Sequence, residues 1–242
     1  MKSLSRSLLS ILFLSSAVLS VRAEEPKKHW KNSTELSVVS QNGNTKSSTT
    51  SGKNTFNYDR SKTGVEIIGG GMGSKSKGQT TAEKYFASEK VSYKLSDRNY
   101  VFEKVAWDKD RFAGIRNRYD SSVGLGRELM KSDKNLWIAE LGGGYVSEER
   151  VNAPRNDFGS GRAYSKYTRT LSPTSNFSQD AEYLANFEDK DDFRVTTETA
   201  LTATLSTHLA LKLSYQWKHV GKPPLGFSRN DTTTTVALVA NY

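Results

Sequence analysis

The chain contains no cysteine and only three histidines among its 242 residues. Without cysteine, disulfide scaffolds, thiolate chemistry and cysteine-based metal sites are all excluded, and three scattered histidines give no cluster for a transition metal. The mean hydropathy is −0.63, and no stretch has the roughly 20 consecutive apolar residues of a membrane-spanning helix. A bundle of membrane helices is therefore excluded. A membrane β-barrel stays open, because its strands meet lipid with only every second residue.

The first 23 residues have the pattern of a secretory signal peptide. Lys2 and Arg6 precede an apolar run over residues 8–19. Val21-Arg22-Ala23 follows, with small residues at the positions that a signal-peptide cleavage site requires. An N-terminal membrane anchor is the alternative, but a helix of this length rises only about 18 Å, well short of a hydrocarbon core of about 30 Å. We therefore predict a signal peptide over 1–23, cleavage between Ala23 and Glu24, and one domain over 24–242.

In the rest of the chain, apolar residues recur at every second position, which is the period of a β-strand. In residues 193–205, for example, Leu201 falls on one parity while Arg194 and Glu198 fall on the other. The facing of one strand stays undecided, because either Glu103 or Lys104 must face the apolar side. The alternation predicts about twelve strands, over residues 29–41, 46–58, 63–73, 83–95, 99–108, 115–130, 135–147, 161–171, 176–188, 192–205, 209–219 and 231–242.

The lengths of these strands and of their connections favour a membrane barrel. Most of the strands exceed the roughly 9–11 residues that a tilted strand needs to cross a bilayer. Every second connection is short and polar, namely 59–62, 96–98, 131–134, 172–175 and 206–208. The alternate connections include the long ones, namely 74–82, 109–114, 148–160 and 220–230. Short periplasmic turns and longer extracellular loops are typical of outer-membrane barrels, so we predict an all-β, antiparallel transmembrane barrel.

Aromatic residues and the last strand support this interpretation. Aromatic side chains gather at both ends of the predicted strands, as expected for two belts at the lipid–water interfaces. The last strand closes with Val236, Leu238, Ala240 and Tyr242 on one parity. An apolar alternation that ends in an aromatic resembles the signal by which bacterial outer-membrane barrels are handed to the barrel-assembly machinery. An ordinary closing strand is the alternative.

Several short motifs lie along the chain, namely Trp30, Gly43-Asn44-Thr45, Tyr100-Val101-Phe102, Asp110-Arg111-Phe112, Gly124-Leu125-Gly126 and Gly142-Gly143-Gly144-Tyr145. In these motifs the chain resembles a family, the salt-induced outer-membrane proteins, which carry a domain of unknown function. The resemblance implies a bacterial outer-membrane barrel and brings no settled activity. In that membrane we expect the barrel to contact lipid and lipopolysaccharide. Removal of the three basic residues of the signal peptide lowers the formal net charge from +9 to +6, which gives no argument for nucleic acid.

The polar parity of the strands predicts a charged lining inside the barrel. Register counted from the turns places Lys166 beside Asp180 and Glu182. Opposite charges on neighbouring strands contribute a few tenths to about 1 kcal/mol each, so we favour an internal network that fills the bore over the selectivity lining of a small passive channel. The candidate lumen residues are Arg116, Arg118, Glu140, Arg162, Lys166, Asp180, Glu182, Arg194, Glu198, Lys212 and Lys218.

Two other classes of protein remain as alternatives. A lipid-modifying barrel enzyme of the phospholipase kind needs a serine within hydrogen-bond reach of a histidine; His219 could meet Ser228 or Asp231, but no paired motif is present. The acidic residues near 148–157 and 189–192 could hold Ca²⁺, although a solvated loop is favoured. A soluble periplasmic all-β protein would turn its apolar faces inward. We expect a structural barrel or passive channel, with no enzymatic activity, cofactor or metal.

Overall fold

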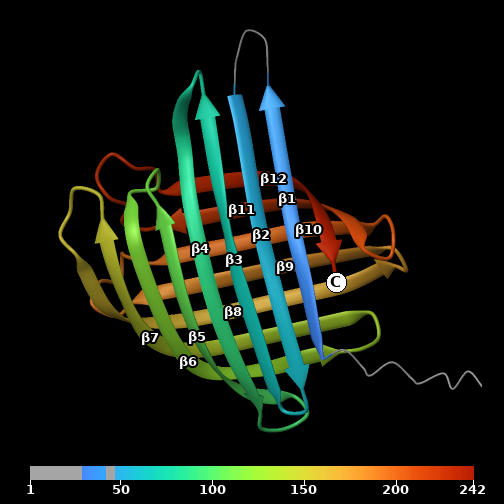
Figure 1. Cartoon of the computed structure of the whole chain (residues 1–242). Coiled ribbons are helices and arrows are strands. Elements are labelled where there is room, and N and C mark those ends of the chain that lie inside the picture. Colours follow the sequence, from blue (N-terminus) through green and yellow to red (C-terminus); the bar gives the residue numbers. More distant parts are fainter. Residues whose placement is uncertain (1–28, 42–46) are drawn as a thin grey trace, which may run out of the picture.

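The computed structural model describes residues 29–41 and 47–242. The predicted signal peptide, its cleavage position and the Gly43-Asn44-Thr45 motif lie outside these residues. The described chain forms one closed antiparallel barrel, in which each strand pairs with the next and β1 pairs with β12 (Figure 1). Its strands are β1 (Trp30–Gln41), β2 (Ser47–Arg60), β3 (Thr63–Ser76), β4 (Gln79–Lys94), β5 (Asn99–Asp110), β6 (Ile115–Lys131), β7 (Asn135–Arg150), β8 (Asn156–Ser172), β9 (Ser175–Asn186), β10 (Arg194–Thr204), β11 (Leu209–Val220) and β12 (Asn230–Asn241). The predicted all-β barrel is confirmed.

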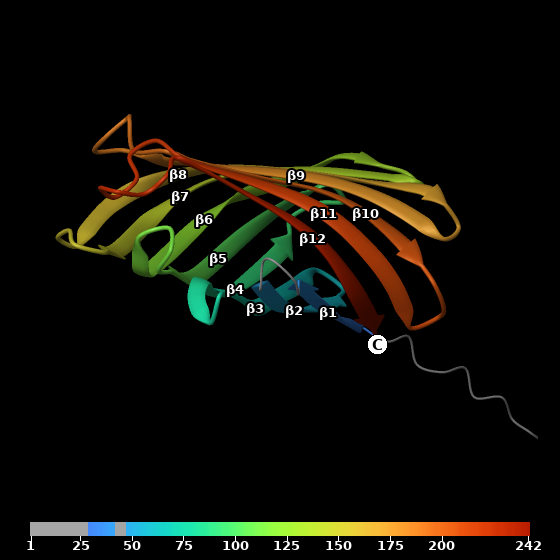
Figure 2. The same cartoon turned by 90° about the horizontal axis from the view of Figure 1, so that it is seen from above.

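The barrel is flattened when it is seen from above (Figure 2). Strands β1–β5 form one wall and β8–β12 form the opposite wall, so side chains of the two walls can meet across the bore. No helix among residues 29–41 and 47–242 is long and apolar enough to cross a membrane.

Alternation along each strand sends apolar side chains outward and polar side chains into the bore. On β10 and β11, Leu201 lies opposite Leu213, and one residue further along Thr202 lies opposite Lys212. Both leucines are exposed, whereas charged residues such as Glu140 are buried. The apolar faces therefore point away from the barrel interior, which removes the interpretation in which they pack inward.

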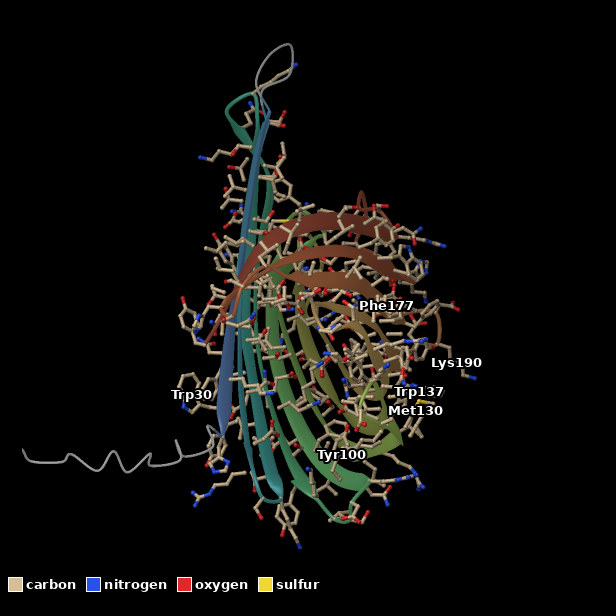
Figure 3. The ribbon with its side chains drawn as sticks, turned by 90° about the vertical axis from the view of Figure 1, so that its right-hand side faces the viewer. Trp30, Tyr100, Met130, Trp137, Phe177 and Lys190 are labelled. Atoms are coloured by element: carbon tan, nitrogen blue, oxygen red, sulfur yellow. The ribbon has the colours of Figure 1, made fainter. Side chains whose placement is uncertain are left out.

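Aromatic residues are exposed at both ends of this outer face. At the end with the short turns they include Trp30, Tyr93 and Trp137; at the other end they include Tyr85, Tyr119 and Tyr145. Trp30 and Trp137 lie on the outer surface, on opposite sides of the ribbon (Figure 3). This arrangement matches the two interfacial belts that the sequence predicts.

The facing of β5 is settled by the register with its neighbours. Lys104 points into the bore and binds Glu182, while Glu103 is exposed on the outer face opposite Val91 and Val123. The charge that breaks the apolar face is therefore Glu103. A second acid, Glu89 on β4, faces outward in the same way.

Two of the connections predicted as long loops are instead mostly strand. The prediction of a loop over residues 74–82 is wrong. Strands β3 and β4 continue to a tight turn at Lys77 and Gly78, whose φ angles of 50° and 83° suit a hairpin turn. Likewise, β7 and β8 extend until only residues 151–155 connect them. In both cases the longer ladder pairs backbone groups that a loop would leave to solvent. The longer connections at this end are 187–193 and 221–229.

Candidate functional site

One cluster of buried charges lies halfway along the bore, around Arg162 of β8. Its guanidinium group donates to Glu140 of β7 at 2.8 Å and to Glu182 of β9 at 2.6 Å. The Arg162 side chain is 3% exposed and that of Glu140 is 0% exposed. One buried cation therefore holds two carboxylates, one on each neighbouring strand.

Residues from the facing wall complete this cluster. Lys90 of β4 and the Tyr100 hydroxyl of β5 donate to Glu140 at 2.9 and 2.8 Å, and Lys104 of β5 donates to Glu182 at 2.8 Å. Strand β4 does not pair with β7, and β5 does not pair with β9. The cluster therefore crosses the bore instead of following the sheet. We call it the waist network, consisting of Lys90, Tyr100, Lys104, Glu140, Arg162 and Glu182.

Aromatic rings hold the arginine of the waist network in place. The guanidinium carbon of Arg162 lies 5.4 Å from the centre of the Phe102 ring and 4.9 Å from that of Tyr164, within the range of a cation–π contact. The rings of Tyr100 and Phe102, both on β5, need glycines beside them on β6. A Cβ atom at Gly126 would lie 2.1 Å from Tyr100, and one at Gly124 would lie 2.8 Å from Phe102. Glycine on β6 therefore makes the space in which the rings lie.

A second cluster lies on the inner surface beside the junction of β1 and β12. Lys212 of β11 binds Glu198 of β10 at 2.9 Å and Glu35 of β1 at 3.2 Å, and Lys53 of β2 lies 3.8 Å from Glu35. Because β12 stands between β11 and β1 in the barrel, the Lys212–Glu35 pair bridges that junction from the inside. We call these four residues the seam cluster.

A third cluster lies at the end with the longer loops. Glu148, which is fully buried, accepts hydrogen bonds from Arg150 and from Arg194, the latter at 2.5 Å. Arg150 also donates to Asp192 at 2.9 Å and to the carbonyl oxygen of Lys222. The cluster therefore ties the connections 187–193 and 221–229 to the barrel wall. Two of the acids weighed as Ca²⁺ ligands, Glu148 and Asp192, are bound to arginine instead.

The structure brings some of the predicted lumen residues together and keeps others apart. Arg118 binds Asp108 at 2.9 Å, and Lys166 lies opposite Asp180 in the register. The waist acids bind Arg162, however, whereas Lys166 forms no ion pair with them in the described chain. Arg116 is exposed beside a β-bulge at the start of β6 and does not reach the lumen clusters. The bulge shifts the parity there, so counting by twos from the turn gave the wrong facing.

Sequence reasoning missed several residues of these clusters, among them Lys104, Glu148 and Glu35. Lys104 lay on the strand whose facing was undecided, and Glu148 lay in a segment predicted as a loop. Glu35 lies on the first strand, where its parity alone would have placed it inside. The signal for Glu35 was therefore present in the alternation, whereas Glu148 required knowledge of where β7 ends.

Cavities remain on either side of these clusters. One of about 330 Å³ adjoins the waist network and has charges of both signs in its lining, among them Lys84, Lys218 and Asp120. Another, of about 130 Å³, adjoins the seam cluster. The bore is therefore interrupted by side chains without being filled along its whole length.

The histidine considered for hydrolysis is engaged elsewhere. The Nδ1 atom of His219 lies 2.8 Å from the side-chain oxygen of Asn230, and its ring lies beside those of Trp217 and Phe193. The hydroxyl of Ser228 donates to the backbone oxygen of Asn230. The described residues therefore do not bring Ser228 and His219 together as a nucleophile and its base.

Comparison with known proteins adds a family and a fold. The family described as "Protein of unknown function, DUF481" matches residues 34–242. The uncharacterized protein YdiY of Escherichia coli (strain K12) is 25% identical over 213 residues, which cover 88% of this chain and 83% of that protein. The predicted resemblance to a family with a domain of unknown function is thereby confirmed.

Two solved barrels have similar folds at low sequence identity. A NanC porin has a TM-score of 0.55 at 9% identity, with 87% of this chain and 98% of that chain covered. The COG4313 outer membrane channel from Pseudomonas putida F1 has a TM-score of 0.52 at 11% identity, with 90% and 99% covered. These values establish an outer-membrane type of barrel fold.

Proposed function

We propose a role for this chain, which belongs to the DUF481 family of proteins of unknown function, from the structure of the barrel itself. It is an integral barrel of the Gram-negative outer membrane with a structural role in the envelope, and its bore is closed at rest by the waist network. The exposed apolar face, the two aromatic belts and the outer-membrane type of fold support this location.

The waist network is the observation that supports a closed bore. Its six residues come from five strands on both walls, and two of them, Glu140 and Arg162, are buried. In a water-filled channel each charge would be solvated separately. Here each carboxylate instead has at least two partners, which is the arrangement expected of a stabilising internal cluster.

Planar-bilayer conductance of the purified full-length mature protein tests this proposal. We expect current near baseline for the wild type and discrete open steps for the variant Lys90→Ala/Glu140→Ala/Arg162→Ala. As a check of folding, unheated protein should migrate differently from boiled protein in SDS gels, because a barrel whose strands hydrogen-bond to their neighbours resists detergent. A steady open current from the wild type would contradict a bore that is closed at rest.

A small passive channel is the second candidate, favoured by the 330 Å³ cavity and by the porin and channel among the similar folds. In that case the charges that line the cavity would set ion selectivity. Lys218→Gln should then shift the reversal potential toward cation selectivity in a salt gradient. Lys190→Gln, which removes an exposed charge from the connection 187–193, is the matched control and should leave the reversal potential unchanged.

A non-enzymatic role is part of the same proposal. The position of His219 supports it, because that ring faces the outer surface beside Trp217 and Phe193 and is bonded to Asn230. An assay of phospholipid hydrolysis by the refolded barrel should show no release of fatty acid, and release that is lost in a Ser228→Ala variant would overturn this view.

The C-terminal strand is proposed as the signal for the barrel-assembly machinery. Val236, Leu238, Ala240 and the terminal Tyr242 share the outward parity, and the first two are exposed opposite leucines of β11. Replacing Val236 and Leu238 by Asp should sharply lower the amount of inserted barrel in cells. Charge that faces lipid at mid-depth costs about 2–4 kcal/mol for basic residues and less for acidic ones, so lost recognition would account for the remainder. Equal loss from Asp at Thr233, which faces inward, would contradict the proposal.

A further inference from the structure

The junction between β1 and β12 is closed along only part of its length. The two strands pair at four positions, Ser33–Leu36 with Leu238–Asn241, whereas β1 and β2 pair at twelve. Figure 2 shows β1 and β12 meeting beside the C-terminus and diverging away from it, and in Figure 3 β1 rises past the level at which β12 turns away. The paired part lies at the end with the short turns, so the gap lies toward the end with the longer loops.

Backbone groups of both strands border this gap. Asn32 and Tyr242 exchange both of their backbone hydrogen bonds, and alternation along an antiparallel ladder directs the groups of Val38 and Val236 toward the gap. An unpaired backbone group that faces lipid costs several kcal/mol. Val39 of β1 has the parity of the lumen and is nevertheless 59% exposed. The gap therefore requires contact with water or with a polar molecule.

The β12 rim of the gap carries hydroxyl groups, unlike the leucine-rich face of β11. On β12, Thr232 and Thr234 share the outward parity of Val236. On the other side β1 presents Leu36 and Val38, and hydroxyl groups return one strand further on, at Ser48 and Thr50 of β2. Hydroxyl groups in a lipid-facing band supply hydrogen bonds without the cost of a charge. This rim provides a path along which a polar head group can pass beside the strands.

Behind the gap lies the cavity of about 130 Å³ that adjoins the seam cluster. Its lining runs from Thr233, Thr235 and Ala237 of β12 to Ser51 and Lys53 of β2, and among the described residues of β1 it includes Glu35 alone. Lys53, Lys84 and Lys212 supply three positive charges to this cavity against the two negative charges of Glu35 and Glu198, and Met72 and Phe86 add apolar surface. The cavity therefore combines a small positive excess with a short apolar wall.

We propose that the open half of the β1–β12 junction is a lateral portal through which the barrel binds the anionic head group of a membrane amphiphile. The phosphate of a lipid would lie against Lys53 and Lys212, displacing part of their contact with Glu35, while the acyl chains would stay between Val38 and Val236. A phosphate-headed lipid fits because its charge matches the positive excess and its chains already lie in the membrane beside the gap. This proposal rests on the placement of the barrel in a membrane.

Photo-crosslinking from three single positions tests the portal. The variants Thr235→benzoylphenylalanine, in the cavity behind the gap, Leu201→benzoylphenylalanine, on the lipid face of β10, and Ser122→benzoylphenylalanine, on the lumen side of β6, would be refolded into phosphatidylcholine vesicles that contain radiolabelled phosphatidylglycerol. We expect lipid adducts from positions 235 and 201 and none above background from position 122. Adding Lys53→Gln/Lys212→Gln to the position-235 variant should lower its adduct several-fold, while the same pair should leave the position-201 adduct unchanged.

Each outcome bears on one step of the inference. No adduct at position 235, with a normal adduct at 201, would overturn the portal while leaving the membrane placement intact. Loss of the adduct at 201 as well would contradict the membrane placement itself. An equal yield at position 235 when the label is carried by phosphatidylcholine alone would overturn selection for an anionic head group. The heat-dependent shift in SDS gels reports whether each variant has folded.

Discussion

Replacing Arg162 by Met is the sharpest perturbation of the waist network. Methionine keeps much of the length of the side chain and can still contact the rings of Phe102 and Tyr164, while it removes the charge that faces Glu140 and Glu182. The packing of the bore is then largely conserved. Any loss of stability therefore reports on the charge of Arg162, through its two ion pairs and its cation–π contacts.

The expected magnitude follows from the burial of the three side chains. Breaking a buried ion pair by removing one partner costs about 3–5 kcal/mol, because the other charge is left buried. Here each carboxylate keeps a second cation, since Glu140 retains Lys90 and Glu182 retains Lys104. We therefore expect the free energy of unfolding to fall by about 3 kcal/mol, at the lower end of that range.

Urea unfolding of the barrel in lipid vesicles, followed by the fluorescence of its four tryptophans, measures this change. The matched control is Arg169→Met, on the same strand, where the arginine is exposed and a surface substitution should change the free energy by less than about 0.5 kcal/mol. The double variant Arg162→Met/Glu140→Gln should lose less than the sum of the two single variants.

A loss below about 1 kcal/mol for Arg162→Met would refute the reasoning, because that is the range of an exposed ion pair. It would mean that water already solvates Glu140 and Glu182 in the folded barrel. The bore would then be open at the waist, and the passive channel would become the better account of the fold.

Three further predictions address the wall, the lipid face and the loops. Gly126→Val should destabilise the barrel by about 1–3 kcal/mol, as overpacking does, and Tyr100→Ala in the same chain should restore part of that loss in urea unfolding. Glu103→Val should raise the free energy of unfolding by about 1 kcal/mol, because an acidic side chain is removed from the lipid face. The hydrogen bond from Lys222 lowers the pKa of Asp189, so the stability that this pair contributes is present at neutral pH and is lost as the pH falls below about 4; Lys222→Gln should raise that pKa toward its ordinary value in a carboxyl NMR titration.

The walls of this barrel could be predicted from the sequence because each depends on neighbours along the chain. Alternation fixes which side chains share a face, and a one-residue slip would turn every charge outward, so the register is strongly specified. The same local rule fails where a bulge adds a residue, as it does at Arg116, and where a ladder outlasts its hydrophobic pattern, as it does on either side of Lys77 and Gly78. At both places the backbone hydrogen bonds determine the facing of the side chains or the end of the strand, and the side-chain pattern does not indicate these bonds.

The contacts across the bore could not be predicted in this way, because they depend on the cross-section of the closed barrel. Lys166 was expected to bind Glu182 since it lies on the neighbouring strand, yet Arg162 reaches that carboxylate and Lys104 arrives from the opposite wall. The distance between β5 and β9 across the flattened bore decides which cation binds the carboxylate of Glu182. This distance depends on strand number and stagger together. The junction of β1 and β12 depends on the same closure, since it joins the first and last strands of the barrel. Partners inside the bore and the length of that junction are therefore set by one property of the fold, and a change in stagger would alter both.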